Sequence, residues 1–147
     1  MPTDYKHIDE KHYLPTFKRL PLTLVKGEGS TVWDDEGNAY IDAMAGIAVN
    51  SLGHSHPKVV KAIQEQAATL MHISNYFLSK PQALLSEKLA QLSGLERVFF
   101  ANSGAEANEG AIKVARKYAH AHGRGGEVVS FSGCFHGRTL ATIATGK

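Results

Sequence analysis

The feature that most constrains the fold is a strand–helix–strand pattern in the last third of the chain. Residues 98–101 form a short continuous apolar run, as expected for a strand buried on both faces of a parallel sheet. Residues 105–120 carry apolar side chains on one face of a helix, and the glycine-rich segment 123–126 ends it. Residues 128–131 have the pattern of a second buried strand. A unit of about 35 residues in this order is typical of a right-handed parallel crossover, so the sequence predicts an α/β fold with the start of a mostly parallel sheet and flanking helices.

The chain changes character near residue 55. Before it, short β-like runs alternate with turn residues, and residues 31–33 and 39–41 are expected to pair as a hairpin around a five-residue loop. A third β-like run covers residues 22–25 and is expected to end at the segment Gly27-Glu28-Gly29. The apolar stretch 43–52 has no periodicity that assigns it to a helix or a strand.

After residue 55 the pattern becomes helical. Pro57 is suited to the first turn of a helix, and apolar residues then recur at spacings of three and four up to Met71. Pro81 begins a second expected helix, and Gly94 is suited to end it as a C-cap. On the helix that follows, Glu109 stands four residues before Lys113, a spacing that favours an ion pair.

Composition excludes several classes of protein. The 147 residues carry 16 Lys and Arg against 14 Asp and Glu, without the concentrated basic face of a nucleic-acid or membrane-surface protein. A single cysteine, Cys134, allows no internal disulfide and no paired-cysteine metal site. No apolar run approaches the roughly 18 residues that span a bilayer, and the N-terminus resembles neither a signal peptide nor a transit peptide. We therefore expect a cytoplasmic protein that binds neither nucleic acid nor membrane.

Two loops are expected at the carboxyl edge of the parallel sheet, where ligands bind in such folds. In the first, Ser103 and Gly104 lead directly into a helix, whose N-terminal N–H groups attract anions such as phosphate. In the second, Phe135 could stack on a planar ring and Arg138 could bind a carboxylate through two hydrogen bonds. The residues alone leave simpler roles open: an N-cap and a tight turn in the first loop, a core aromatic and a surface charge in the second.

Two other sets of side chains point less clearly to a site. His54 and His56 are spaced like metal ligands, but without a third ligand at a telling spacing they favour a turn at the entry to a helix. No metal site is expected. Cys134 lies in the second loop, where packing is a commoner role than nucleophilic attack.

Several motifs resemble those of the class III aminotransferases, which have fold type I and depend on pyridoxal 5′-phosphate (PLP). The resemblance covers the chain from about residue 15 onward and is carried by residues 46–57, 72–75, 102–109 and 135–139. Within the family it is strongest to the acetylornithine aminotransferases. It implies that residues 1–55 belong to a small domain with dimer contacts, and that residues 56–147 form the first part of the large PLP-binding domain.

The resemblance also implies the roles of individual residues. Ser103, Gly104 and Ala105 are expected to bind the cofactor's phosphate, Phe135 to stack on its ring, and Arg138 to bind the substrate's carboxylate. Many relatives carry a hydroxyl residue where this chain has Ala105, so a modestly lower cofactor affinity is expected. The implied reaction moves the terminal amine of N2-acetylornithine through PLP to 2-oxoglutarate, in arginine biosynthesis, in a homodimer. Succinylornithine, ornithine and 4-aminobutyrate aminotransferases are alternatives within the family.

One departure from the family concerns the catalyst itself. The family's Schiff-base lysine is expected beyond residue 147, and Lys147 matches no such motif. A lysine amine forms the covalent link to the cofactor and moves the proton. This stretch is thus expected to supply residues that bind cofactor and substrate but no catalytic residue. The alternative outside the enzymes is a non-catalytic fragment that only binds a phosphate ligand.

Overall fold

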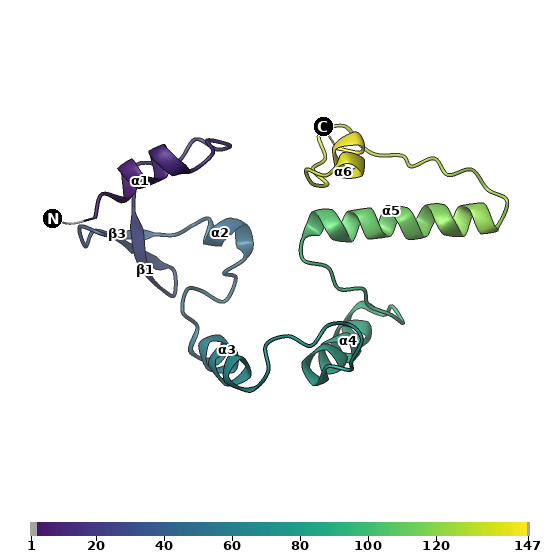
Figure 1. Cartoon of the computed structure of the whole chain (residues 1–147), viewed down its shortest axis with the longest axis horizontal. Coiled ribbons are helices and arrows are strands. Elements are labelled where there is room, and N and C mark those ends of the chain that lie inside the picture. Colours follow the sequence, from purple (N-terminus) through teal and green to yellow (C-terminus); the bar gives the residue numbers. More distant parts are fainter. Residues whose placement is uncertain (1–2, 147) are drawn as a thin grey trace. The chain divides into compact units, whose positions relative to one another are not determined.

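The computed structural model describes residues 3–146 of the chain, which divides into two units, Met1–Ser74 and Asn75–Lys147. In the first unit the elements are α1 (Tyr5–His12), β1 (Leu24–Glu28), β2 (Thr31–Asp34), β3 (Ala39–Ile41), α2 (Ala45–Ala48) and α3 (Pro57–Thr69) (Figure 1). In the second they are α4 (Lys80–Ser93), α5 (Gly104–Ala121) and α6 (Leu140–Ala144).

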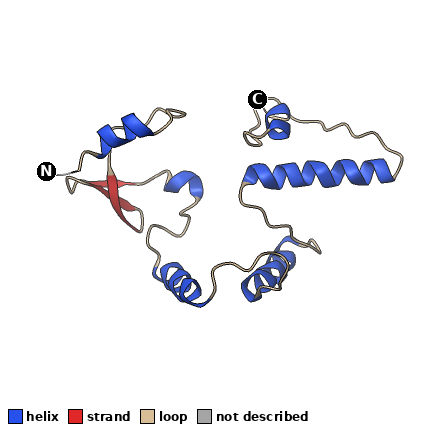
Figure 2. Cartoon of the chain, viewed as in Figure 1, coloured by secondary structure: helices blue, strands red, loops and turns tan. Residues whose placement is uncertain are grey.

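The first unit is built around an antiparallel sheet of strand order β1-β2-β3, shown in red in Figure 2. The expected hairpin is confirmed, since β2 and β3 pair with Val32 opposite Tyr40. The first strand ends at Glu28, inside the expected segment 27–29, but it starts at Leu24 and not at Leu22. A Cβ at Gly27 would lie 2.6 Å from the Cγ of His54, so a glycine in this strand lets the imidazole pack against its backbone.

A carboxylate closes the hairpin loop. Asp34 is only 6% exposed, and its oxygens accept hydrogen bonds from the backbone N–H groups of Glu36 and Asn38, the Asn38 amide and the Tyr40 hydroxyl, at 2.8–3.1 Å. The side chain of Asn38, followed by Tyr40 and the two N–H groups, holds the pKa of Asp34 below its ordinary value. Asp34 therefore stabilises the loop when its carboxylate is ionised.

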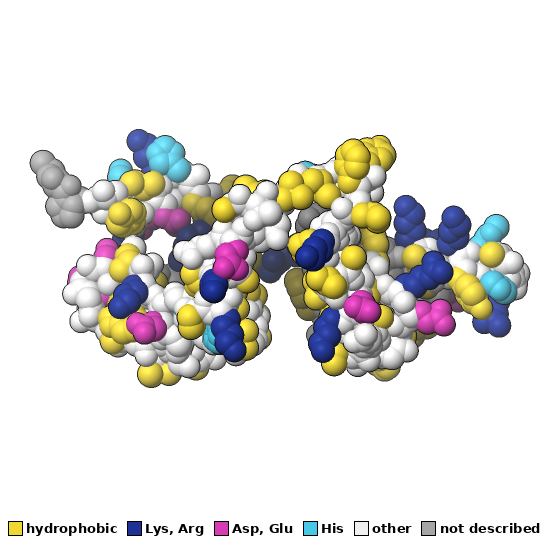
Figure 3. Space-filling model, turned by 90° about the horizontal axis from the view of Figure 1, so that it is seen from below, with side chains coloured by type: hydrophobic (Ala, Val, Ile, Leu, Met, Phe, Trp, Pro, Cys, Tyr) yellow, Lys and Arg dark blue, Asp and Glu magenta, His cyan; other side chains and the backbone are white. Residues whose placement is uncertain are grey.

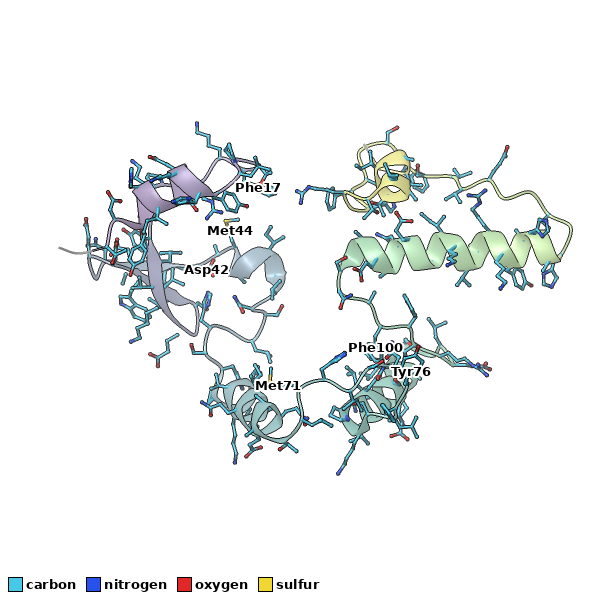
Figure 4. The ribbon with its side chains drawn as sticks, in the orientation of Figure 1. Phe17, Asp42, Met44, Met71, Tyr76 and Phe100 are labelled. Atoms are coloured by element: carbon cyan, nitrogen blue, oxygen red, sulfur yellow. The ribbon has the colours of Figure 1, made fainter. Side chains whose placement is uncertain are left out.

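A second carboxylate joins the segment after β3 to the segment before α3. Asp42, labelled in Figure 4, accepts a bond from His54 Nε2 at 2.7 Å and from the N–H groups of Met44 and Ala45, both at 2.9 Å. The His54 contact is the main reason that the pKa of Asp42 is lowered. At α2, where periodicity assigned no structure, residues 45–48 have φ between 48° and 64°. Such left-handed backbone costs about 1–2 kcal/mol per non-glycine residue, so the bonds around Asp42 hold a strained turn.

The helices largely follow their sequence signals. Pro57 lies in the first turn of α3, Pro81 in the first turn of α4, and Gly94 caps α4 in the left-handed conformation, all as expected. The helix α1 was not anticipated. Its signals are the N-cap Asp4, which accepts from the His7 N–H, and basic residues in the last turn.

The two strands expected at residues 98–101 and 128–131 are not formed; among the described residues, both segments lack regular secondary structure. The expected start of a parallel sheet is therefore not present in this part of the chain. A strand buried on both faces needs neighbouring strands to complete its ladder and helices to cover it. Phe99, Val129 and Phe131 are instead highly exposed.

Apolar exposure extends to both units. The chain exposes 13292 Å², whereas two compact bodies, each of half its 15.9 kDa, would together expose about 8,900 Å². Figure 3 shows hydrophobic side chains on the visible surface of each unit. Among the described residues, only Val32, Asp34 and Thr142 are buried.

We expect Asp34→Ala to weaken the hairpin, because it removes four hydrogen bonds from one part of the loop. Trp33, the only tryptophan, lies in β2 and reports on this region by its fluorescence during urea unfolding. The folded pKa of Asp34 is lowered, so its contribution is present above the unfolded pKa of about 3.9 and is lost as pH falls through the folded value. The variant should therefore have a lower urea midpoint than the wild type at pH 7. Its midpoint should also fall less than that of the wild type when the pH is lowered into the acid range.

The matched control is Asp35→Ala, since Asp35 is an exposed neighbour in the same loop. An equal fall in midpoint for both variants would contradict the role assigned to the Asp34 network.

Candidate functional site

The first part of the site is the N-terminus of α5. Ser103 is the N-cap, and its hydroxyl oxygen accepts a hydrogen bond from the Glu106 N–H at 3.2 Å. The Glu106 carboxylate in turn accepts from the backbone N–H and the side-chain amide of Asn102, at 2.7 and 3.0 Å. Ser103 thus has the N-cap role that the sequence left open as the simpler alternative, and these bonds connect the cap to the residue that precedes it.

This helix end has the features of an anion site. The N–H groups of the first turn, including those of Gly104 and Ala105, have no partner within the helix, and the helix dipole is positive there. A Cβ at Gly104 would meet no atom within 4 Å, so the backbone of Gly104 is open to a ligand. Unpaired N–H groups at an accessible helix N-terminus are an arrangement that binds tetrahedral anions such as phosphate in other proteins.

The second predicted loop is packed directly on this helix end. The Asn108 side-chain amide of α5 donates to the carbonyl oxygen of His136 at 2.7 Å. Gly137 has φ +137°, and a Cβ there would lie 2.6 Å from the Ala105 Cβ and 2.8 Å from the Thr142 Oγ1. The structure therefore brings the two predicted loops together, with Gly137 seated on the residue expected to contact phosphate.

The loop continues into α6, which is tied to α5 by a carboxylate. Glu109 Oε1 accepts from the Thr139 hydroxyl at 2.6 Å and from the Ala141 N–H at 3.2 Å. Thr139 and Thr142 form a reciprocal capping box at the start of α6, and Thr142 is fully buried. The expected pairing of Glu109 with Lys113 is not among the ion pairs of the described residues, so that expectation was wrong. Glu109 instead bonds to the Thr139 hydroxyl and the Ala141 N–H.

The two side chains expected to contact ring and substrate lie next to each other. The Arg138 guanidinium carbon is 5.3 Å from the centre of the Phe135 ring, and Phe135 is 74% exposed. Arg138 makes further interactions as well. Between them in sequence, the ring Nδ1 of His136 is buried without a hydrogen-bond partner among the described residues, which is uncommon in folded proteins.

Sequence reasoning missed the residues that hold this loop in place, namely Asn108, Glu109, Thr139 and Thr142. The spacing of the two threonines is that of a capping pair and could have indicated a helix start at Leu140. No local signal shows that Asn108 and Glu109 contact residues about thirty positions later.

The other side chains that the sequence singled out do not join this site. His54 is bound to Asp42, and the described residues contain no group of three or more His, Cys, Asp or Glu arranged to hold a metal ion. Cys134 is a partly exposed free thiol. Lys147 lies outside the described residues. No helix in residues 3–146 is both long and apolar enough to cross a membrane.

Comparisons with known proteins place the chain in one family. The family model described as Aminotransferase class-III matches residues 13–147. The acetylornithine aminotransferase of Methanocaldococcus jannaschii is 55% identical over 139 residues, which cover 93% of this chain and 35% of that protein. This chain therefore spans about a third of the length of such relatives.

Solved structures give the same result. The N-acetylornithine aminotransferase of Stenotrophomonas maltophilia K279a matches with TM-score 0.76 and 46% identity, over 88% of this chain and 36% of that one. An ornithine aminotransferase of Toxoplasma gondii, described with partial occupancy of PLP at its active site, matches with TM-score 0.88 and 31% identity, over 97% of this chain and 34% of that one. The fold type I resemblance is thus shown. Because the family match covers most of the chain, the protein belongs to the class III aminotransferases.

Proposed function

We propose that this chain supplies the phosphate-binding and substrate-orienting residues of a PLP-dependent aminotransferase. The family is PLP-dependent. The observation that carries the proposal is the seating of Gly137 on Ala105, because it puts the loop of Phe135 and Arg138 beside an N-terminal helix end suited to phosphate.

The cofactor's phosphate would be bound at the first turn of α5. The N–H groups of Gly104 and Ala105 would donate to its oxygens, aided by the helix dipole. The Ser103 oxygen already accepts from Glu106, so its own hydroxyl proton can point to the phosphate. Ala105 contributes a backbone N–H but no hydroxyl, and its Cβ faces Gly137. We expect this to weaken cofactor binding modestly.

The loop would orient the rest of the complex. Phe135 offers an exposed ring that would stack on the pyridine ring, and Arg138 offers a planar guanidinium that would bind the substrate's carboxylate through two hydrogen bonds. When bound, PLP supplies an electron sink for the carbanion formed at the substrate carbon. The residues described here would bind and orient; the lysine that moves the proton is expected beyond residue 147.

For the whole protein we propose N2-acetylornithine as the amino donor and 2-oxoglutarate as the acceptor, with a homodimer as the assembly. The support is that relatives named acetylornithine aminotransferase are 48–55% identical to this chain. Residues 1–55 would belong to the small domain and residues 56–147 to the large domain.

The phosphate site is tested by adding a charge without removing the helix cap. Ser103→Asp keeps a good N-cap but puts a negative charge where the phosphate would bind. We expect the affinity for PLP, measured by absorbance titration of the 147-residue chain, to fall by at least about tenfold, since the loss includes a charge-assisted hydrogen bond. Helix content by circular dichroism should be unchanged.

Ser86→Asp on α4 serves as the control, because it adds the same charge to another helix of the same unit. Unchanged PLP affinity in Ser103→Asp would contradict the phosphate assignment. Borohydride reduction of the PLP complex, followed by mass measurement, tests the missing catalyst: a specific pyridoxyl adduct on one lysine would contradict a chain without a Schiff-base lysine.

The role of Arg138 is tested with two ligands that differ by a carboxylate-bearing arm, namely PLP and N-phosphopyridoxyl-glutamate. We expect Arg138→Ala to lower the affinity for the glutamate conjugate by about tenfold or more while PLP affinity stays within about twofold. Arg124→Ala, in the exposed segment after α5, is the control. Equal losses for both ligands would instead assign Arg138 to the cofactor.

A further inference from the structure

We propose that Asn108 and Glu109 of α5 are positioning residues: they form a latch that sets Phe135 and Arg138 against the phosphate-binding turn. The latch is defined by the bonds of Asn108 to His136 and of Glu109 to Thr139 and Ala141. The consequence for ligands rests on the proposed function, whereas the latch itself is measurable without a ligand.

The latch has two anchors, which lie on either side of the arginine. Asn108 holds the carbonyl of His136, directly after Phe135, and Glu109 holds the hydroxyl of Thr139, directly after Arg138. Between the anchors, Gly137 contacts Ala105 so closely that a Cβ would clash at 2.6 Å. Each ligand-contacting side chain of the loop thus adjoins a backbone segment tied to α5.

The segment that leads into this loop has no regular structure to hold it. Residues 122–138 have no regular secondary structure, and most of residues 122–133 are exposed. Helix α6 has only five residues, too few for a stable isolated helix. In Figure 1 the chain returns from the end of α5 to place α6 beside its beginning. The latch bonds join residues 28 to 32 positions apart and offset the entropy lost in closing this loop.

Electrostatics favours Glu109 in this place. Its carboxylate accepts the N–H of Ala141 in the first turn of α6, where a negative charge interacts favourably with the helix dipole. The same oxygen accepts the Thr139 hydroxyl at 2.6 Å, a short bond of the kind made to a charged acceptor. Glu109 therefore acts as a capping group for α6 that is supplied by α5.

The first test measures amide hydrogen exchange in the ligand-free 147-residue chain. Glu109→Ala should speed exchange at Thr139 and Ala141 by about tenfold or more, because the Ala141 N–H loses its acceptor and the Thr139 hydroxyl loses its bond to α5. Glu109→Gln keeps an acceptor oxygen and should restore most of the protection. Thr139→Val removes the hydroxyl that donates to Glu109 and should speed exchange as Glu109→Ala does. The control is Glu87→Ala on α4, an exposed glutamate of the same unit.

The second test separates positioning from general stabilisation by a double-mutant cycle. Affinities for inorganic phosphate and for PLP are compared in the wild type, Glu109→Ala, Phe135→Ala and the double variant. Glu109→Ala should leave phosphate affinity within about twofold but remove most of the additional affinity for PLP, and the double variant should lose no more than Phe135→Ala alone. If Glu109 had a purely structural role, the losses of PLP affinity in the two single variants would add in the double variant, or Glu109→Ala would lower the affinities for both phosphate and PLP.

The outcomes distinguish the latch from the proposed function. The latch would be overturned, whatever ligand binds, by either of two results. One is that the Ala141 amide is not protected in the wild type; the other is that its protection is equal in Glu109→Ala and Glu87→Ala. Protection lost in Glu109→Ala and regained in Glu109→Gln supports the latch, even if neither phosphate nor PLP binds the wild type. That absence of binding would instead count against the phosphate site at α5.

Discussion

The candidate site depends on one packing contact, that of residues 136–142 on the first turns of α5. Gly137 sits on Ala105 at a distance that excludes any side chain, Asn108 holds the loop at His136, and Glu109 caps the helix that follows. These contacts bring a helix end suited to phosphate together with an exposed aromatic ring and an arginine. These contacts are what relate Ser103 to Arg138, which lies 35 positions later in the sequence.

The first unit contains a similar arrangement, in which a carboxylate holds irregular backbone. Asp42 bonds to His54 and to the N–H groups that lead into a left-handed turn. A glycine again makes room, since Gly27 has no Cβ where the His54 ring lies. In both units, therefore, a carboxylate holds a segment with no regular geometry of its own: Glu109 on α5 in the second unit, and Asp42, directly after β3, in the first.

Local signals predicted most of the regular elements. The hairpin of β2 and β3 and the helices begun by Pro57 and Pro81 follow from period, turn residues and proline placement, which act within a few residues. The strands expected at residues 98–101 and 128–131 are different, because a buried strand is stable only in a completed sheet. The chain has the apolar pattern for that sheet and matches about a third of the length of its relatives. Its pattern indicates the family's fold, but the ladder itself requires neighbours that the described residues do not provide.

The sequence by itself determined the helix that begins after Ser103 and indicated the family. It also singled out the candidate residues Ser103, Gly104, Ala105, Phe135 and Arg138. Each of these can be read from a short contiguous motif, because helix caps, turns and family motifs involve residues that are close together in the sequence. Only the tertiary structure decided that Glu109 caps α6 and that Asn108 holds His136, because these bonds join positions about thirty residues apart. Spacing along a chain specifies which side chains share a helix face, but it does not specify which distant backbone group will pack against that face.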